Sequence, residues 1–461
     1  MSSALDYAKQ HADTFHRNLL DLIRIPSIST LPENKKDIQR AAEWLIDDMR
    51  RIGLRTHLYS TAGHPIVYGE WLKAGDDAPT VLIYGHYDVQ PAELEAGWMS
   101  DPFEPEEKDG KIYARGSSDD KGQVFAQLKA VESLLASDEG SPVNIKVLIE
   151  GEEEISSLHL GAFVRNNPEL LRADVCVISD TGMQSKEQPA IVYSLRGLVY
   201  MELHVQGPAQ DLHSGAFGGT VHNPAQALCE IVAALHNPDG SIAVDGFYDD
   251  VLTLSSQERE EMARTNITED RHRQTTGVPR AWGEPGYSLR EKIGARPTLE
   301  VNGLLSGFTG EGAKTVLPAK AMAKISCRLV ANQDPERIYT LVRQQVERLT
   351  PPTVRSELRL LHTAEPAFAD LNAPAMHAAV AAYEKGWGNR PVFVREGGTI
   401  GVVADFQREL HVPIILMGFG LDSDGAHGPN EHFHVDMFHK GIDTAIHFLK
   451  AVATHVRRAT G

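Results

Sequence analysis

The fold is decided by the stretch Pro79-Thr80-Val81-Leu82-Ile83-Tyr84-Gly85-His86-Tyr87-Asp88-Val89-Gln90-Pro91. Its first half is apolar and rich in β-branched residues, which is typical of a buried parallel strand and not of a strand that faces solvent. The strand runs directly into polar residues, beginning with His86. Because ligands bind at the carboxyl ends of the strands in open α/β sheets, His86 stands where a binding site is expected.

A His-x-Asp pair such as His86 and Asp88 is a weak signal on its own. A surface histidine beside an aspartate is the more common explanation of any single copy. A metal site is therefore indicated only if further ligands follow other strands.

Two other predicted strands end in the same way. The apolar run 144–149 leads into Glu150-Gly151-Glu152-Glu153-Glu154, and the run 174–178 leads into Ser179-Asp180. A solvated acidic turn explains the glutamates equally well when they are taken alone. The repetition of polar ligands at the same end of three strands favours one shared site.

A turn and a late loop add two more candidate ligands. The turn Ser117-Ser118-Asp119-Asp120 lies between a short strand at 111–116 and a helical pattern at 124–135. It is a good N-cap for that helix, but capping does not explain two adjacent aspartates. Near the carboxyl terminus, the buried strand 412–417 precedes a glycine-rich loop that carries His427. This histidine would supply the distant nitrogen ligand.

The composition is that of an acidic globular protein. Of the 461 residues 42% are hydrophobic, and the formal net charge of −18 argues against nucleic acid or an anionic membrane as a partner. The three cysteines, Cys176, Cys229 and Cys327, are far apart, so we expect a reducing compartment and no disulfide framework. The start of the chain lacks the pattern of a signal peptide, and no window approaches the length of about 18 apolar residues that a membrane span needs. We therefore expect a cytoplasmic protein.

The middle of the chain changes character. The pattern at 199–205 alternates as a half-exposed strand does, the segment 209–219 is rich in glycine and serine, and 237–300 is mostly polar. A further candidate strand follows at 320–328. This pattern indicates an α+β domain inserted into the first domain.

Six motifs together carry a family resemblance: HYDVQP, YARGSSDDKG, LIEGEEE, VISD, DLHSG and GAHGPNE. Their order and approximate spacing resemble those of the M20 family of metallopeptidases over nearly the whole chain. Within that family the chain is most similar to the branch of cytosolic non-specific dipeptidases and carnosinases, on the strength of residues 86–92, 313–318 and 328–332. The resemblance implies an α/β catalytic domain with a mostly parallel sheet flanked by helices, at 1–196 and 365–461. It also implies an inserted α+β lid and dimerisation domain at 197–364.

The resemblance further implies two divalent metal ions, zinc foremost, with manganese or cobalt also used. His86 and Asp180 would hold one ion, Glu154 and His427 the other, and Asp119 with a water would bridge both. Imidazole and carboxylate ligands suit zinc or manganese. Metal binding lowers the pKa of such a water to about 7, which provides a bridging hydroxide as nucleophile.

The family register also assigns two supporting roles. Glu153 would be the general base beside the bridging water, although Glu152 competes for that role within the run of three glutamates. Asp88 would accept the free N–H of His86 and so fix the tautomer of its ring. In the family the peptide bond that follows the bridging aspartate is often cis, and we expect this of Asp119–Asp120.

Resemblance nominates four substrate-binding residues. His213 matches a lid histidine that reaches the neighbouring subunit's site and steadies the oxyanion, and Thr315 matches a residue offered across the same dimer. Arg328 and Thr399 match residues that bind the carboxylate end of the substrate, although a strand arginine is also a common solvent-exposed residue. Thr399 departs from the relatives' usual serine and keeps the hydroxyl.

The motifs together predict a homodimeric dinuclear metallopeptidase that cleaves the amide bond of dipeptides with a free carboxyl end. The nearest alternative keeps the site and changes the substrate to an N-acyl amino acid or succinyl-diaminopimelate. A dinuclear phosphohydrolase would need basic residues near the ligands, and the motifs hold mainly acidic ones. A non-catalytic metal-binding scaffold is the remaining alternative, and the presence of all five ligands and the base argues against it.

Overall fold

The computed structural model describes residues 2–265, 267–398 and 400–456. The chain forms two compact units. The first unit comprises Met1–Tyr193, Ala369–Val394 and Gly401–Gly461, and the second comprises Ser194–Phe368 and Arg395–Ile400.

The first unit is built on a nine-stranded sheet, of which residues 194–195, 367–368 and 395 are counted with the second unit. Its strand order is β1 (Arg55–Tyr59), β2 (Ile66–Trp71), β6 (Asn144–Glu150), β3 (Thr80–His86), β7 (Val175–Ile178), β18 (Ile414–Leu416), β9 (Ala190–Leu195) and β16 (Ala367–Phe368), with β17 (Val392–Arg395) also on β9. The strands β6, β3, β7 and β18 run parallel, whereas β1, β2, β9 and β16 are antiparallel to their neighbours. The α/β class is confirmed, and the sheet is parallel only at its centre.

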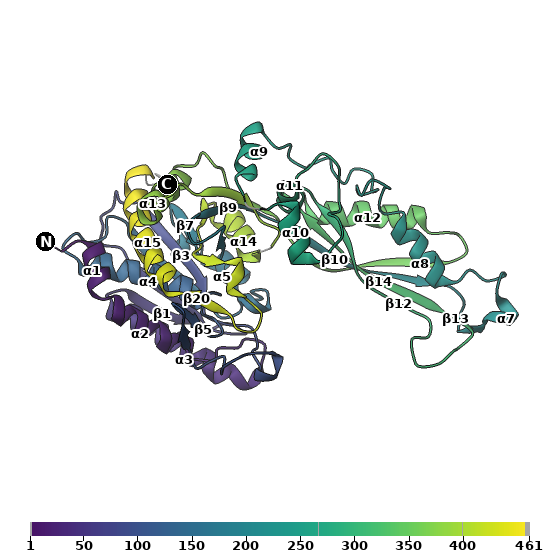
Figure 1. Ribbon diagram of the computed structural model, residues 1–461, viewed down its shortest axis with the longest axis horizontal. Coiled ribbons are helices and arrows are strands. Elements are labelled where there is room, and N and C mark those ends of the chain that lie inside the picture. Colours follow the sequence, from purple (N-terminus) through teal and green to yellow (C-terminus); the bar gives the residue numbers. More distant parts are fainter. Residues whose placement is uncertain (1, 266, 399, 457–461) are drawn as a thin grey trace. The chain divides into compact units, whose positions relative to one another are not determined.

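Helices cover both faces of this sheet (Figure 1). One layer holds α3 (Lys35–Arg51), α4 (Lys121–Ala136), α13 (Pro374–Trp387) and α15 (Val435–His455), and the other holds α5 (Leu160–Asn166) and α14 (Gly401–Leu410). Successive residues of β3 face opposite helix layers: Tyr84 packs against Phe406 of α14, and Gly85 faces Val124 of α4. A side chain at Gly85 would collide with Val124, so glycine here allows α4 to lie close to the strand that carries His86.

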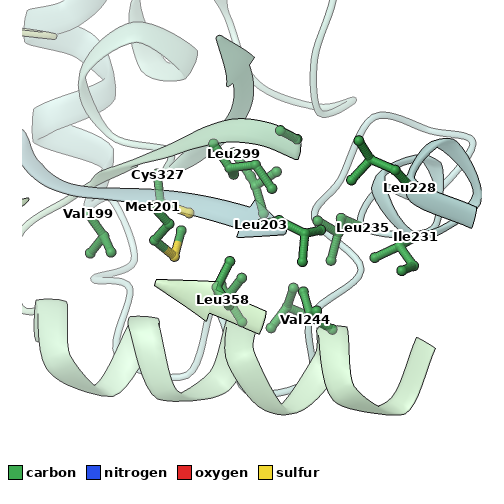
Figure 2. Packing of buried hydrophobic residues seen from close by; sticks show 14 of the residues in the cluster. Val199, Met201, Leu203, Leu228, Ile231, Leu235, Val244, Leu299, Cys327 and Leu358 are labelled. Atoms are coloured by element: carbon green, nitrogen blue, oxygen red, sulfur yellow. The ribbon is translucent and has the colours of Figure 1, made fainter. Parts of the chain in front are cut away.

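The second unit is an antiparallel four-stranded sheet in the order β12 (Thr298–Ser306), β14 (Lys320–Leu329), β10 (Gly197–Gln206) and β15 (Arg355–Ala364). Alternate residues of β10, among them Val199, Met201 and Leu203, are buried under the helices α8 (Pro224–Ala233) and α12 (Pro335–Leu349). Figure 2 shows these side chains with Leu228 and Ile231 of α8 in one apolar core. The strand alternation predicted at 199–205 is confirmed.

The remaining elements are short or peripheral. The small sheets pair β4 (Glu106–Lys108), β5 (Lys111–Tyr113) and β20 (His432–His434), then β8 (Gly182–Met183) with β19 (Gly420–Leu421), and β11 (Leu212–His213) with β13 (Val316–Leu317). The other helices are α1 (Ala4–Gln10), α2 (Ala12–Ile23), α6 (Pro168–Leu171), α7 (Ser214–Phe217), α9 (Ser256–Ala263), α10 (Glu269–Thr276) and α11 (Leu289–Gly294). Within the described ranges, no helix is both long and apolar enough to cross a membrane.

Candidate metal centre

Three candidate ligands meet at the carboxyl ends of β3 and β7. His86 is the last residue of β3, Asp180 follows β7, and Asp119 lies just before α4. One ligand atom of each lies within 4.8 Å of the others. The Nε2 atom of His86 is 3.1 Å from Asp119 Oδ1 and 3.8 Å from Asp180 Oδ2. Parallel pairing of β3 with β7 brings His86 and Asp180 to the same edge of the sheet.

A second group shares Asp119 with the first. Glu154 lies in a short 3-10 turn, Glu153–Ile155, which follows β6, and His427 comes from the loop between β19 and β20. The Nε2 atom of His427 is 3.0 Å from Asp119 Oδ2 and 3.1 Å from Glu154 Oε2. Asp119 therefore turns one carboxylate oxygen toward each histidine. Its peptide bond to Asp120 is cis, as the resemblance predicts.

Asp88 contacts a residue of each ligand group, His86 in the first and Glu154 in the second. The Nδ1 atom of His86 lies 3.0 Å from the backbone carbonyl of Asp88 and 3.4 Å from its carboxylate. The same carboxylate accepts hydrogen bonds from the backbone N–H groups of Glu153 and Glu154, at 3.2 and 3.1 Å. With its proton on Nδ1, His86 keeps the Nε2 lone pair for a metal ion. Asp88 thus fixes a histidine of one group and the backbone of a ligand in the other.

The three consecutive glutamates have different surroundings. The carboxylate of Glu152 accepts hydrogen bonds from the backbone of His64 at 3.0 Å and from the ring of His159 at 2.8 Å. Glu154 reaches His427 instead. Burial raises the pKa of the Glu153 carboxyl to about 7, and the charge of Glu154 adds to this effect while His86 opposes it. A carboxylate with a pKa near neutrality can both accept and release a proton.

The charges of the two groups fit a divalent cation. Hydrogen bonds to Asp119 and then to Glu154 raise the pKa of His427 to about 10. Burial would lower the pKa of His86, but its hydrogen bonds to Asp119 and Asp88 outweigh burial and raise the pKa well above the usual value. Burial, followed by the charge of Asp119, raises the pKa of Asp180 strongly. The cluster therefore has an excess of carboxylates, and its oxygen and imidazole donors suit zinc or manganese.

A third group of metal-type side chains consists of Asp424, His432 and His434. Lysine ammonium groups lie next to both imidazoles, with Lys111 Nζ 3.1 Å from His432 Nε2 and Lys186 Nζ 3.4 Å from His434 Nδ1. These two positive charges oppose a divalent cation at this place. We therefore assign no metal to this group.

Three of the four nominated substrate residues, His213, Thr315 and Arg328, belong to the second unit. His213 ends β11, and its Nδ1 atom accepts a hydrogen bond from the backbone N–H of Gly215 at 3.0 Å. The backbone carbonyl of Thr315 accepts a hydrogen bond from Ser214 N at 3.1 Å, so Thr315 lies beside His213 on the same ribbon. Arg328 lies on β14, opposite Leu198 and Thr298. Thr399 lies outside the described residues, and the approach of all four to the metal ligands stays a prediction.

Two contacts of the ligands are not predicted from the sequence. Gln90 donates a hydrogen bond from Nε2 to Glu154 Oε2 at 2.7 Å. Glu431 accepts hydrogen bonds from Ser118 N at 2.9 Å and Asp119 N at 3.0 Å. Both residues lie within quoted motifs, HYDVQP and GAHGPNE. Their presence in these motifs as polar residues with no assigned role was the only sequence feature that could have pointed to contacts with the ligands.

Known proteins match this chain over most of its length. The sequence profile described as peptidase family M20/M25/M40 matches residues 82–451. A Cys-Gly metallodipeptidase of Schizosaccharomyces pombe is 33% identical, over 96% of this chain and 96% of its own length. The Beta-Ala-His dipeptidase of Homo sapiens is 30% identical, over 94% of this chain and 88% of its own length. The crystal structure of an M20 family metallo-carboxypeptidase from Sulfolobus solfataricus superposes with a TM-score of 0.83 at 32% identity, covering 95% of this chain and 99% of the other.

Proposed function

The chain belongs to the peptidase family M20/M25/M40, and on that premise we propose that it is a dinuclear metallodipeptidase that cleaves dipeptides with a free carboxyl end. The observation that carries the proposal is the pair of ligand groups that share Asp119. His86 and Asp180 would hold one divalent ion, and Glu154 and His427 the other. We propose zinc for both positions, with manganese or cobalt as substitutes.

The residues around Asp119 divide the chemistry among them. When bound, the two cations supply Lewis-acid polarisation of the scissile carbonyl and a water of lowered pKa. Glu153 would take the proton from the attacking water and pass it to the nitrogen of the leaving amine as the C–N bond breaks. Its pKa of about 7 suits both transfers. Asp88 would keep His86 and the backbone of Glu153 in place throughout.

The second unit would supply the substrate-binding groups and the dimer contact. Because Nδ1 of His213 accepts a hydrogen bond, the neutral ring carries its proton on Nε2 and can donate to a developing oxyanion. The edge strand β12 exposes Val301, Leu304 and Leu305, at 37%, 57% and 59% of their surfaces. An apolar, unpaired sheet edge favours pairing with a second copy of the chain. We propose that His213 and Thr315 act across such a dimer, and that Arg328 and Thr399 bind the substrate carboxylate.

A substrate panel tests the proposal directly. After removal of metal by chelation and reconstitution with single metals, we expect hydrolysis of dipeptides and only weak hydrolysis of N-acyl amino acids. The named relatives favour dipeptides, since two of them are dipeptidases. Hydrolysis of acyl amino acids alone would replace the dipeptidase proposal with a deacylase. Full activity of the metal-free protein would end the metallopeptidase proposal altogether.

The role of Asp88 leads to a separate prediction. Asp88→Asn keeps the shape of the side chain but weakens its acceptance of the backbone N–H groups of Glu153 and Glu154, and it removes the negative charge 3.4 Å from Nδ1 of His86. We expect kcat/KM to fall about 10- to 100-fold, with a similar fall in metal affinity, because groups that orient metal ligands typically have effects of this size. Gln90→Glu is a useful comparison, since it adds a charge next to Glu154 without touching His86. Unchanged metal affinity in Asp88→Asn would contradict the role.

A further inference from the structure

Two ligand-bearing loops of the first unit are joined by a buried carboxylate. Glu431 is completely buried, and it stands four residues after the ligand His427. Its side chain accepts hydrogen bonds from three backbone N–H groups of the Asp119 loop: Gly116 at 3.1 Å, Ser118 at 2.9 Å and Asp119 at 3.0 Å. A residue of the His427 loop therefore fixes the backbone that presents Asp119.

The reverse contact comes from Arg115, which stands on the Asp119 loop. Its Nη1 atom donates to Glu431 Oε2 at 2.8 Å, and its Nη2 atom donates to the backbone carbonyl of His427 at 3.2 Å. The ion pair is buried, with 3% of the Arg115 side chain and none of the Glu431 side chain exposed. Each partner thus belongs to one loop and binds the backbone of the metal ligand on the other loop.

The backbone at His427 shows why such a contact matters. Its φ angle is +63°, in the left-handed region that residues other than glycine rarely adopt. A residue in this conformation persists where its surroundings impose it. The hydrogen bond from Arg115 to the carbonyl of His427 is one such constraint.

We infer that the Arg115–Glu431 pair is a positioning device that presets the spacing between Asp119 and His427. This inference rests on the proposed function, because it gives the pair its purpose in holding the second cation. The pair does not touch the cation or the substrate. It acts by fixing the two backbones from which the ligands project, so that Asp119 can turn one oxygen to each metal position.

The test compares two buried glutamates in the same unit. Glu431→Gln replaces one acceptor oxygen with an amide NH₂, which cannot accept a hydrogen bond. In place of Oε2 it would face the N–H groups of Gly116 and Arg115, and in place of Oε1 those of Ser118 and Asp119. Glu132→Gln is the matched control: Glu132 is also buried and paired, with Arg51 and Lys129, and it has no recorded contact with a metal ligand among the described residues. Tm of the metal-free proteins, metal affinity by chelator competition, and kcat and KM are measured for both.

We expect metal affinity to fall about 10- to 100-fold in Glu431→Gln, and kcat to fall with KM little changed. Glu132→Gln should lower Tm while leaving metal affinity as in the wild type. The absorption spectrum of the cobalt-loaded protein should change in Glu431→Gln alone, since it reports ligand geometry. Arg115→Lys, which keeps the charge and loses the fork, should reproduce the loss of affinity if Glu431→Gln does not fold.

Equal metal affinity in wild type and Glu431→Gln would overturn the inference. So would losses of affinity in both glutamate variants in proportion to their losses of Tm, because the pair would then be a stability contact only. If the wild type binds two ions but hydrolyses no peptide, the proposed function fails while the affinity comparison still decides the role of the pair.

Discussion

Glu153→Ala should lower kcat for a dipeptide by about 10² to 10⁴, which is the range for a positioned general base. Both metal ions should remain bound, because the side chains that would hold them are His86, Asp119, Glu154, Asp180 and His427. The physical reason is the environment of the carboxyl: burial raises its pKa to about 7, where it can take a proton from water and return it. Steady-state kinetics together with the metal content of the purified protein measure the result.

The neighbouring glutamate provides the control for this prediction. Glu152 is committed to hydrogen bonds with His64 and His159, so Glu152→Ala should affect stability more than turnover. Glu152 is the alternative candidate for the general base. Loss of turnover in Glu152→Ala, with turnover kept in Glu153→Ala, would assign that role to Glu152. A fully active Glu153→Ala would show that the proton is taken by some other group.

The sequence predicted the centre of the fold well, because buried parallel strands leave a strong pattern. The apolar runs that contain Ile83, Val147 and Val177 all form central strands of the first unit. Since parallel strands align their carboxyl ends, polar residues that follow them must gather at one edge. This is why one shared site could be anticipated from residues that lie far apart in the chain. Its division into two groups that share Asp119 was implied only by the family resemblance.

The antiparallel margin of the sheet was not predicted. β1 is partly exposed and β16 has only two residues, which weakens the hydrophobic pattern of both strands. β2 and β9 are buried strands of six residues, and their apolar pattern does not show in which direction a strand runs. The orientation of the Glu152 side chain could not be predicted either, because it depends on hydrogen bonds with His64 and His159 and not on the local sequence pattern. The Arg115–Glu431 pair joins loops that are 316 residues apart in the chain, and without family information no spacing rule links such residues.

The hydrophobic pattern of the sequence also does not show which unit supplies the substrate-binding residues. His213 is an exposed residue of a two-residue strand, and its sequence environment is that of an ordinary turn. The hydrogen bond from Gly215 to Nδ1 gives it a chemical property, a donor on Nε2, that residue type alone does not define. Whether that donor serves the same chain or its partner requires an experiment on mixed dimers.

His213→Ala should lower kcat for a dipeptide by about 10² to 10³, the usual cost of removing one oxyanion donor. Metal content should be unchanged, since His213 belongs to the second unit and none of the proposed ligands does. His204→Ala, another histidine of the second unit that pairs with Glu202, serves as the control and should keep full activity.

Mixing two inactive variants then decides between action within a chain and action across a dimer. If His213 acts in trans, a dimer of one Glu153→Ala chain and one His213→Ala chain contains one complete site: the chain with intact Glu153 receives His213 from its partner. Random reassortment makes half of the dimers mixed, so about a quarter of the wild-type activity should return. If His213 acts within its own chain, every site of every dimer lacks one group and no activity returns. Recovery measured against the unmixed variants at equal total concentration therefore separates the two arrangements, and recovery would also show that two copies of the chain associate.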